Sequence, residues 1–142
     1  MITVSIRAGL AAGILISSAG PGNAQEEVRD LLRTGKTVLE QPIVYPTGAP
    51  AEVTSAIITI EPGGERGWHK HDVPLFGYIL DGELTIDFGP QGQRVFRKGE
   101  ALVEAIGVPH NGRNLGSEPV CILAVFMGKQ GTPDTVMVSQ PK

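Results

Sequence analysis

The chain has little of several features that would direct its fold or its partners. It contains one cysteine in 142 residues, so no disulfide forms within it and the fold must rest on a hydrophobic core or a bound metal. Charged residues make up 19% and aromatic residues 5% of the chain, which argues against a coiled coil or a long helical bundle. The formal net charge of −3 gives no electrostatic reason to bind nucleic acid.

The chain also lacks an apolar run of the roughly 20 residues that a membrane-spanning helix needs. Its N-terminal apolar run, Ala8–Ile16, follows Arg7 and precedes the small residues Gly22-Asn23-Ala24. This three-part pattern is typical of a secretory signal peptide rather than an anchor. We expect residues 1–24 to be cleaved and residues 25–142 to form one domain. The mature protein is then secreted, into the periplasm if the source is a bacterium with two membranes, and is not inserted in the membrane.

Turn-forming residues are plentiful: 19 Gly and 11 Pro favour a β-rich domain with many turns. Before the first strand, Val28, Leu31 and Leu32 have helical spacing and Gly35 is a suitable stop, which predicts a short helix over 25–35. Short apolar runs divided by turn residues then predict an all-β fold, an antiparallel barrel or jelly roll over about 43–127. The expected strands are 43–45, 53–60, 68–71, 75–80, 83–88, 94–97, 101–105 and 120–127.

Two of these runs carry finer expectations. Asp81-Gly82 lies between two apolar runs and predicts a hairpin with a two-residue turn, because both turn positions need positive φ. The 120–127 run is apolar at nearly every position, so we expect both faces of that strand to be covered. Cys121 lies in that run, and we interpret it as a small core hydrophobe rather than a nucleophile.

The three histidines are the candidate site residues. His69 and His71 lie two positions apart, so on a strand both imidazoles face the same side. Each imidazole needs a hydrogen-bond partner, and a divalent cation between them makes the pair favourable. His110 follows Pro109 and precedes polar residues. From these residues alone, a metal site and a chance H-x-H with a solvated loop histidine both remain open.

The surroundings of the histidines resemble the two sequence motifs of the cupin family. These motifs are G-x5-H-x-H-x3–4-E-x6-G and G-x5-P-x-G-x2-H-x3-N. The matching positions are Gly63, His69, His71 and Gly82 in the first, and Gly99, Gly107, His110 and Asn114 in the second. The resemblance implies one divalent transition metal held by the three histidines, with Fe preferred and Zn, Ni, Mn or Cu as alternatives. Proteins of this family often dimerise, so the resemblance also makes a homodimer one expected state of the chain.

Two positions depart from the family pattern. The first motif's glutamate is replaced by Leu75, which cannot bind a metal, and the second motif's proline is Ala105. Glu104 stands immediately before Ala105. In one interpretation Glu104 points into the barrel as a fourth ligand, a residue that orients a ligand, or a general base. In the other it lies on the outer face in water, and the resemblance does not decide between them.

The remaining lining follows from strand parity. Leu75, Gly77 and Ile79 share the parity of the histidines, so we expect them to face inward. Trp68, Phe76 and Tyr78 should pack against another layer or a second subunit. Arg113 is either a residue that binds an anionic substrate or a solvated surface residue, and we favour the second. We interpret Glu65-Arg66 as an ordinary exposed loop.

The resemblance leaves the function open, since a fold does not fix a function. Cupins with related sites include dioxygenases, isomerases, lyases and proteins that only bind ligands. We expect a secreted metal-dependent oxidoreductase, dioxygenase-like, that acts on a small organic substrate. The alternatives are a non-catalytic periplasmic module that binds a small molecule or a metal, and a metal-dependent lyase or isomerase.

Overall fold

The computed structural model describes residues 27–142, so the expected leader, residues 1–24, lies outside the described residues. The described chain is almost entirely β-structure, which confirms the all-β prediction. The strands are β1 (Ala51–Ile60), β2 (His69–Lys70), β3 (Leu75–Asp81), β4 (Glu83–Asp87), β5 (Gln93–Arg97), β6 (Ala101–Val103), β7 (Asn111–Arg113), β8 (Val120–Lys129) and β9 (Val136–Met137), with a short 3₁₀ helix η1 (Gly89–Gln91).

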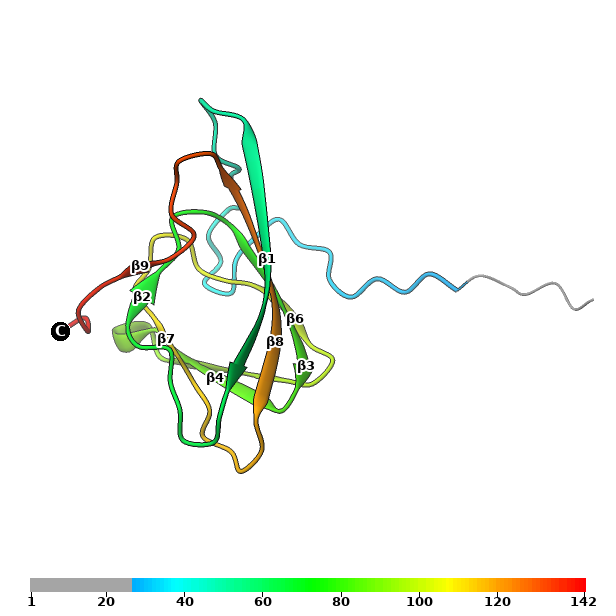
Figure 1. Ribbon diagram of the computed structural model, residues 1–142, viewed down its shortest axis with the longest axis vertical. Coiled ribbons are helices and arrows are strands. Elements are labelled where there is room, and N and C mark those ends of the chain that lie inside the picture. The colour runs from blue at the N-terminus through cyan, green and yellow to red at the C-terminus, as the bar shows by residue number, and fades with distance from the viewer. Residues whose placement is uncertain (1–26) are drawn as a thin grey trace, which may run out of the picture.

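The strands form three antiparallel sheets that enclose one interior. The largest has the order β1-β8-β3-β6, the second β5-β4-β7, and the third pairs β2 with β9. Figure 1 shows β1 and β8 along one side of the molecule and β2, β7 and β9 along the other. Apolar side chains from the two larger sheets meet between them, among them Ile79 and Leu102 on one side and Leu84 and Ile86 on the other. Several side chains of this core also line the site described below.

The predicted hairpin at Asp81-Gly82 is wrong. β3 pairs with β6 and β8, whereas β4 pairs with β5 and β7, so the chain crosses from one sheet to the other at this turn. Gly82 has φ +76°, and a Cβ there would lie 2.6 Å from the carbonyl oxygen of Pro119. Only Gly82 has the positive φ that was predicted for both positions, because Asp81 lies in the extended strand. A turn signal also does not determine whether the flanking strands pair.

The predicted helix over 25–35 is also wrong for its described part, residues 27–35, which contain no helix. The apolar side chains that suggested it are in water, with Val28 81% and Leu31 52% exposed. A helix this short is marginal unless its apolar stripe packs against the rest of the protein. No such packing occurs here, so the segment is extended.

The predicted strand over 43–45 is absent too, and its neighbours take its place. Lys36 and Pro42 form an isolated bridge, and the Val38 N–H donates to the Val103 carbonyl at 2.9 Å. Residues 36–42 therefore cover the free edge of β6, while Val44 is exposed. The other seven predicted strands are present within a few residues, but β7 and β9 were not predicted. β7 reads Asn-Gly-Arg, which carries no apolar signal, and β9 has two residues.

Burial along residues 120–127 alternates, although both faces of this strand were predicted to be covered. Its even positions, Val120, Ile122, Ala124 and Phe126, are buried, whereas the odd positions are only half-buried. Cys121 lies on this half-buried outer face, so it is not a core residue. No helix in the described part of the chain is long and apolar enough to cross a membrane.

Candidate metal centre

The structure brings the three predicted histidines together. His69 begins β2, and His71 follows two residues later with its ring on the same side. His110 lies directly opposite His69: the His69 N–H donates to the His110 carbonyl at 2.9 Å, and the His110 N–H donates to the His69 carbonyl at 2.8 Å. The three ring centres lie 4.5 to 5.1 Å apart. Residues that are distant in sequence therefore present three buried imidazoles to one point.

One nitrogen of each ring is already occupied by a backbone carbonyl. A carbonyl oxygen only accepts hydrogen bonds, so the Nδ1 atom that faces it carries the proton and Nε2 keeps its lone pair. All three Nε2 atoms are thus in the form that binds a metal, with the tautomer fixed by the backbone. The acceptors are the carbonyls of Gly67 for His69 (2.7 Å), Asp134 for His71 (2.6 Å) and Val108 for His110 (2.9 Å).

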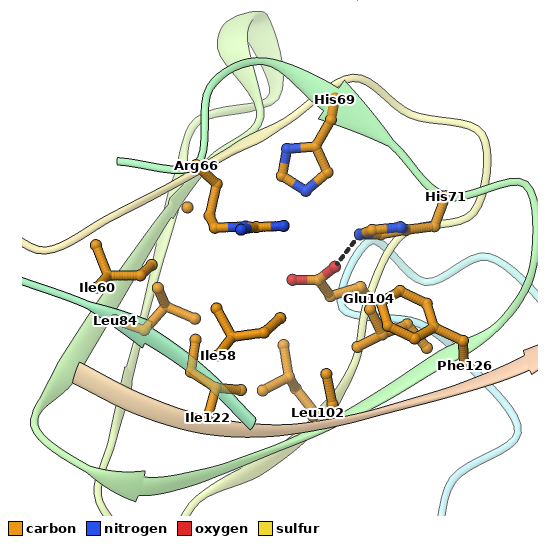
Figure 2. A pocket seen from close by; sticks show the side chains of 14 residues that line it. Ile58, Ile60, Arg66, His69, His71, Leu84, Leu102, Glu104, Ile122 and Phe126 are labelled. Carbon is orange, nitrogen blue, oxygen red and sulfur yellow. Dashed lines mark ion pairs between the residues drawn. The ribbon is translucent and has the colours of Figure 1, made fainter. Parts of the chain in front are cut away.

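Glu104 faces the same point, so the interpretation that placed it in water is wrong. Its Oε2 atom lies 3.0 Å from His71 Nε2 and 3.2 Å from His110 Nε2, and its side chain is 13% exposed. Figure 2 shows its carboxylate below the rings of His69 and His71. The Glu104 N–H donates to the carbonyl of Leu75 at 3.0 Å, so Glu104 stands across the strand pair from the position where the family motif has its glutamate.

Burial and mutual contact shift the pKa values of His69, Glu104 and His110 away from their ordinary values. Burial lowers the pKa of His69 to about 4. Burial opposes ionisation of Glu104, but contact with His110 and His71 lowers its pKa below the usual range. Burial alone would lower the pKa of His110, but Glu104 raises it. Within the described residues, neither Glu104 Oε2 nor His110 Nε2 has a hydrogen-bond partner, and buried polar atoms of this kind are rare without one.

His69, His71 and Glu104 form one end of a small cavity (Figure 2). Its free volume is about 40 Å³, which holds about three water molecules at about 10–15 Å³ each. Arg66 reaches into it from the loop before β2, and the rest of the wall is aliphatic or aromatic. The apolar lining residues are Ile58, Ile60, Leu75, Leu84, Leu102, Ile122, Ala124 and Phe126.

Strand parity predicted part of this lining correctly. Leu75 and Gly77 line the cavity, and Ile79 lies in the adjoining core. Phe76 and Tyr78 face outward and are half-buried. Arg66 is exposed to solvent, as predicted. The prediction did not place its side chain in the wall of the cavity, where it lies. Nothing in the local sequence distinguishes it from a surface arginine.

Two motif positions are structural. Asn114 is buried; its Nδ2 donates to the carbonyls of Ile60 and Glu118, both at 2.8 Å, and its Oδ1 accepts from the Gly116 N–H at 3.0 Å. This amide joins the start of β8 to the end of β1. The Asp134 carbonyl that orients His71 was not predicted, because a backbone acceptor 63 residues away in sequence leaves no residue-type signal.

A family model of the cupin domain matches residues 56–126, which is half of the chain. The chain belongs to the cupin family. No curated protein matches this cupin. The matched range contains β2 to β7, parts of β1 and β8, and all four side chains of the centre. β9 and the Asp134 carbonyl lie beyond it.

Solved structures share the fold. The oxalate decarboxylase of Lactobacillus farciminis, in a formate complex, has a TM-score of 0.53 and 26% identity over 61% of this chain and 26% of its own. The DMSP lyase of Ruegeria pomeroyi has a TM-score of 0.54 and 20% identity over 63% of this chain and 45% of its own. The oxalate decarboxylase of Bacillus subtilis, which has Mn(II) centres, has a TM-score of 0.50 and 22% identity over 70% of this chain and 30% of its own. This cupin spans less than half the length of each.

Proposed function

We propose that this cupin holds one divalent transition metal through His69, His71, His110 and Glu104. The observation that carries the proposal is the convergence of three Nε2 lone pairs and one carboxylate oxygen in a buried place. The Oε2 atom of Glu104 lies 3.0 Å from His71 Nε2 and 3.2 Å from His110 Nε2. The lone pairs of such neighbouring atoms repel each other unless a proton or a cation lies between them. A cation satisfies all four groups at once, whereas a proton satisfies two.

Two separations support Glu104 as a ligand beside the three histidines, those from its Oε2 to His71 Nε2 and to His110 Nε2. Ligand atoms about 2.0–2.2 Å from one metal lie about 3 Å apart when they are adjacent. Three neutral imidazoles and one carboxylate suit Fe(II) and Mn(II), and imidazole also suits Zn, Ni and Cu. We propose Fe as the resident metal, with Mn, Zn, Ni or Cu as the outcomes that metal analysis would distinguish.

We further propose that the protein is an oxidoreductase of the dioxygenase type that acts on a small organic substrate. The bound metal would supply redox chemistry at coordination positions that four protein ligands leave open. The chain itself supplies a small cavity with mostly apolar walls, which limits the contact of the reacting centre with bulk water. The cavity volume limits the enclosed part of the substrate to a few non-hydrogen atoms.

A second candidate, a metal-dependent lyase or decarboxylase, is favoured by the structural likeness to an oxalate decarboxylase and a DMSP lyase. In that case Glu104 is the group in reach to move a proton, since its carboxylate lies at the cavity and next to two imidazoles. A non-catalytic binding module remains the third reading. It uses the same four side chains but has no turnover.

The experiment that separates these functions combines metal analysis with oxygen dependence. The purified protein is reconstituted with Fe(II) or Mn(II) and offered a panel of small organic acids and alcohols in air and under argon. Oxygen uptake that requires both iron and substrate supports the oxidoreductase. Turnover that continues under argon supports the lyase, and tight retention without product in either gas supports the binding module.

We also propose that the protein is secreted to the periplasm as a homodimer. The leader pattern of residues 1–24 supports secretion. The outer face of the four-stranded sheet supports a dimer: Val53 and Ile57 on β1 are 65% and 60% exposed, and Leu123 lies beside Ile57 on β8. Residues 27–32 extend away from the barrel (Figure 1) with further exposed apolar side chains, so each copy brings both an apolar face and a segment to cover it. Light scattering should give twice the chain mass, and a monomer for the V53D/I57D variant.

A further inference from the structure

The segment of residues 104–110 carries two of the four proposed ligands, Glu104 at its start and His110 at its end. Both ends are tied to the barrel by the backbone. The Glu104 N–H donates to the Leu75 carbonyl at 3.0 Å, and the His110 N–H donates to the His69 carbonyl at 2.8 Å. Between its ends the segment belongs to none of the strands, since β6 ends before it and β7 begins after it. Whatever holds its middle therefore affects how the two ligands face each other.

The middle of this segment is held by the side chain of Gln41. Its Nε2 donates to the Ile106 carbonyl at 2.9 Å, and the Ile106 N–H donates to its Oε1 at 3.0 Å. Within the described residues, these are the hydrogen bonds that the N–H and the carbonyl of Ile106 make. A primary amide offers a donor and an acceptor side by side, as a peptide group does. Gln41 thus takes the place that a neighbouring strand would fill.

The same stretch of backbone is also joined to a proposed ligand. The Gly107 N–H donates to the His71 carbonyl at 2.7 Å, and Ile106 forms an isolated bridge with His71. Without Gln41, a half-buried N–H and carbonyl would lose their partners, which is costly unless the backbone turns toward water. Glu104 lies two residues before Ile106 and would turn with it.

Gln41 is itself fixed in place before it reaches Ile106. The buried Thr37 hydroxyl donates to Gln41 Oε1 at 3.1 Å and accepts from the Gln41 N–H at 3.3 Å. The Val38 N–H donates to the Val103 carbonyl at 2.9 Å, which docks this segment on the end of β6. In Figure 2 the segment is the pale blue trace that passes behind Glu104. A side chain held in this way can position what it contacts.

We propose that Gln41 is a positioning residue of the metal centre: its amide holds the backbone at Ile106 and so sets how Glu104 and His110 face the cation. This inference rests on the proposed metal site. It adds to that site a part of the chain outside residues 56–126, the range that the cupin domain matches. Because Gln41 acts through the backbone of Ile106, its loss should distort the centre rather than empty it.

The test compares the wild-type protein with Q41M, both loaded with Mn(II). Methionine keeps the length of the side chain but removes both hydrogen bonds to Ile106. Metal affinity, measured by competition with a chelator, should fall about tenfold, as when residues that orient ligands are lost. The electron paramagnetic resonance spectrum of bound Mn(II), which depends on the symmetry of its ligands, should change as well. Q41N has a side chain one carbon shorter, cannot make both hydrogen bonds, and should behave as Q41M does.

L39A is the control for a merely structural role. Leu39 lies in the same segment and packs against the hydrophobic core, so L39A should lower the thermal stability of the protein at least as much as Q41M does. It leaves the hydrogen bonds between Gln41 and Ile106 in place. The affinity for Mn(II) and the spectrum of L39A should therefore be those of the wild type.

Metal content is measured on every protein, so the two claims fail differently. A wild-type protein that takes up no metal contradicts the proposed function, and the inference with it. A folded Q41M variant with wild-type affinity and spectrum overturns the role of Gln41 alone. An L39A variant whose affinity and spectrum change as much as those of Q41M also overturns it, because the effect then follows stability. If Q41M does not fold, Q41N is compared with L39A in the same way.

Discussion

Glu104 stands directly across the β3–β6 strand pair from Leu75, its N–H donating to the Leu75 carbonyl at 3.0 Å. Leu75 occupies the position of the cupin motif's glutamate. Residues opposite each other on antiparallel strands share a face, with Cβ atoms about 4.5–5.5 Å apart. A carboxylate on either strand therefore reaches the same space beside the histidines. The centre keeps its carboxylate although the motif has lost it.

This relationship predicts that Glu104 is needed for metal binding. In E104Q the side chain keeps its size and position but loses the charge that balances a divalent cation. We expect metal affinity to fall about 10–100-fold with little change in the fold. Competition with a chelator of known affinity measures it. E52Q, which removes a carboxylate on the exposed part of β1, is the control and should match wild type.

The same relationship predicts that the carboxylate can be moved back. The double variant L75E/E104L restores the motif's glutamate and replaces Glu104 by an apolar side chain. It should recover most of the affinity that E104L alone loses. L75E alone places two carboxylates close together, which repel each other unless both bind the metal. If the double variant binds metal no better than E104L, the two positions are not equivalent and the strand-exchange account is wrong.

Side-chain periodicity predicted the inner face of the site, because period-two alternation is a local property. His69, His71, Leu75 and Gly77 were placed correctly for that reason. The position of Glu104 could not be decided in the same way. Its neighbours Val103 and Ala105 are both buried, so apolar residues on each side of it do not mark an outer face.

The rest of the site depends on contacts between distant segments. Glu65 pairs with Arg113 rather than with its sequence neighbour Arg66, which lines the cavity. The helix expected over 25–35 failed for a related reason. Its spacing is helical, but the described residues offer no surface against which Val28 and Leu31 pack. Local pattern predicts what a segment can bury, and the tertiary structure decides whether it does.

The C-terminal segment should contribute to metal affinity, although it lies beyond the matched cupin domain. The Asp134 carbonyl accepts from His71 Nδ1 at 2.6 Å, and β9 pairs with β2. A chain that ends at Gly131 loses both, so His71 loses the acceptor that fixes its tautomer. We expect about a 10–100-fold loss of metal affinity, measured by the same chelator competition.

A chain that ends at Val138 is the matched control, because it keeps Asp134 and β9. Amide spectra of β1 and β8 in both truncated chains will report whether the barrel is intact. Equal metal affinity of the two chains, with the barrel folded in both, would mean that this carbonyl does not position His71.

The leader predicts the mass of the mature protein. If residues 1–24 are a signal peptide, protein recovered from the periplasm of its host should begin at Gln25. Intact-mass measurement distinguishes this chain from the full one by the mass of the leader. Full-length protein in the cytosol, with none exported, would show that the N-terminal pattern is not an export signal.

Metal content is the most direct test of the central claim that the four side chains hold one cation. Elemental analysis of protein purified from its native compartment should give about one divalent transition metal per chain, with Fe expected. H69A, H71A and H110A should each lose most of the metal, and with it the stability that metal binding contributes to the folded state. A folded wild-type protein without metal after reconstitution, or an H69A variant with full metal content, would contradict the account.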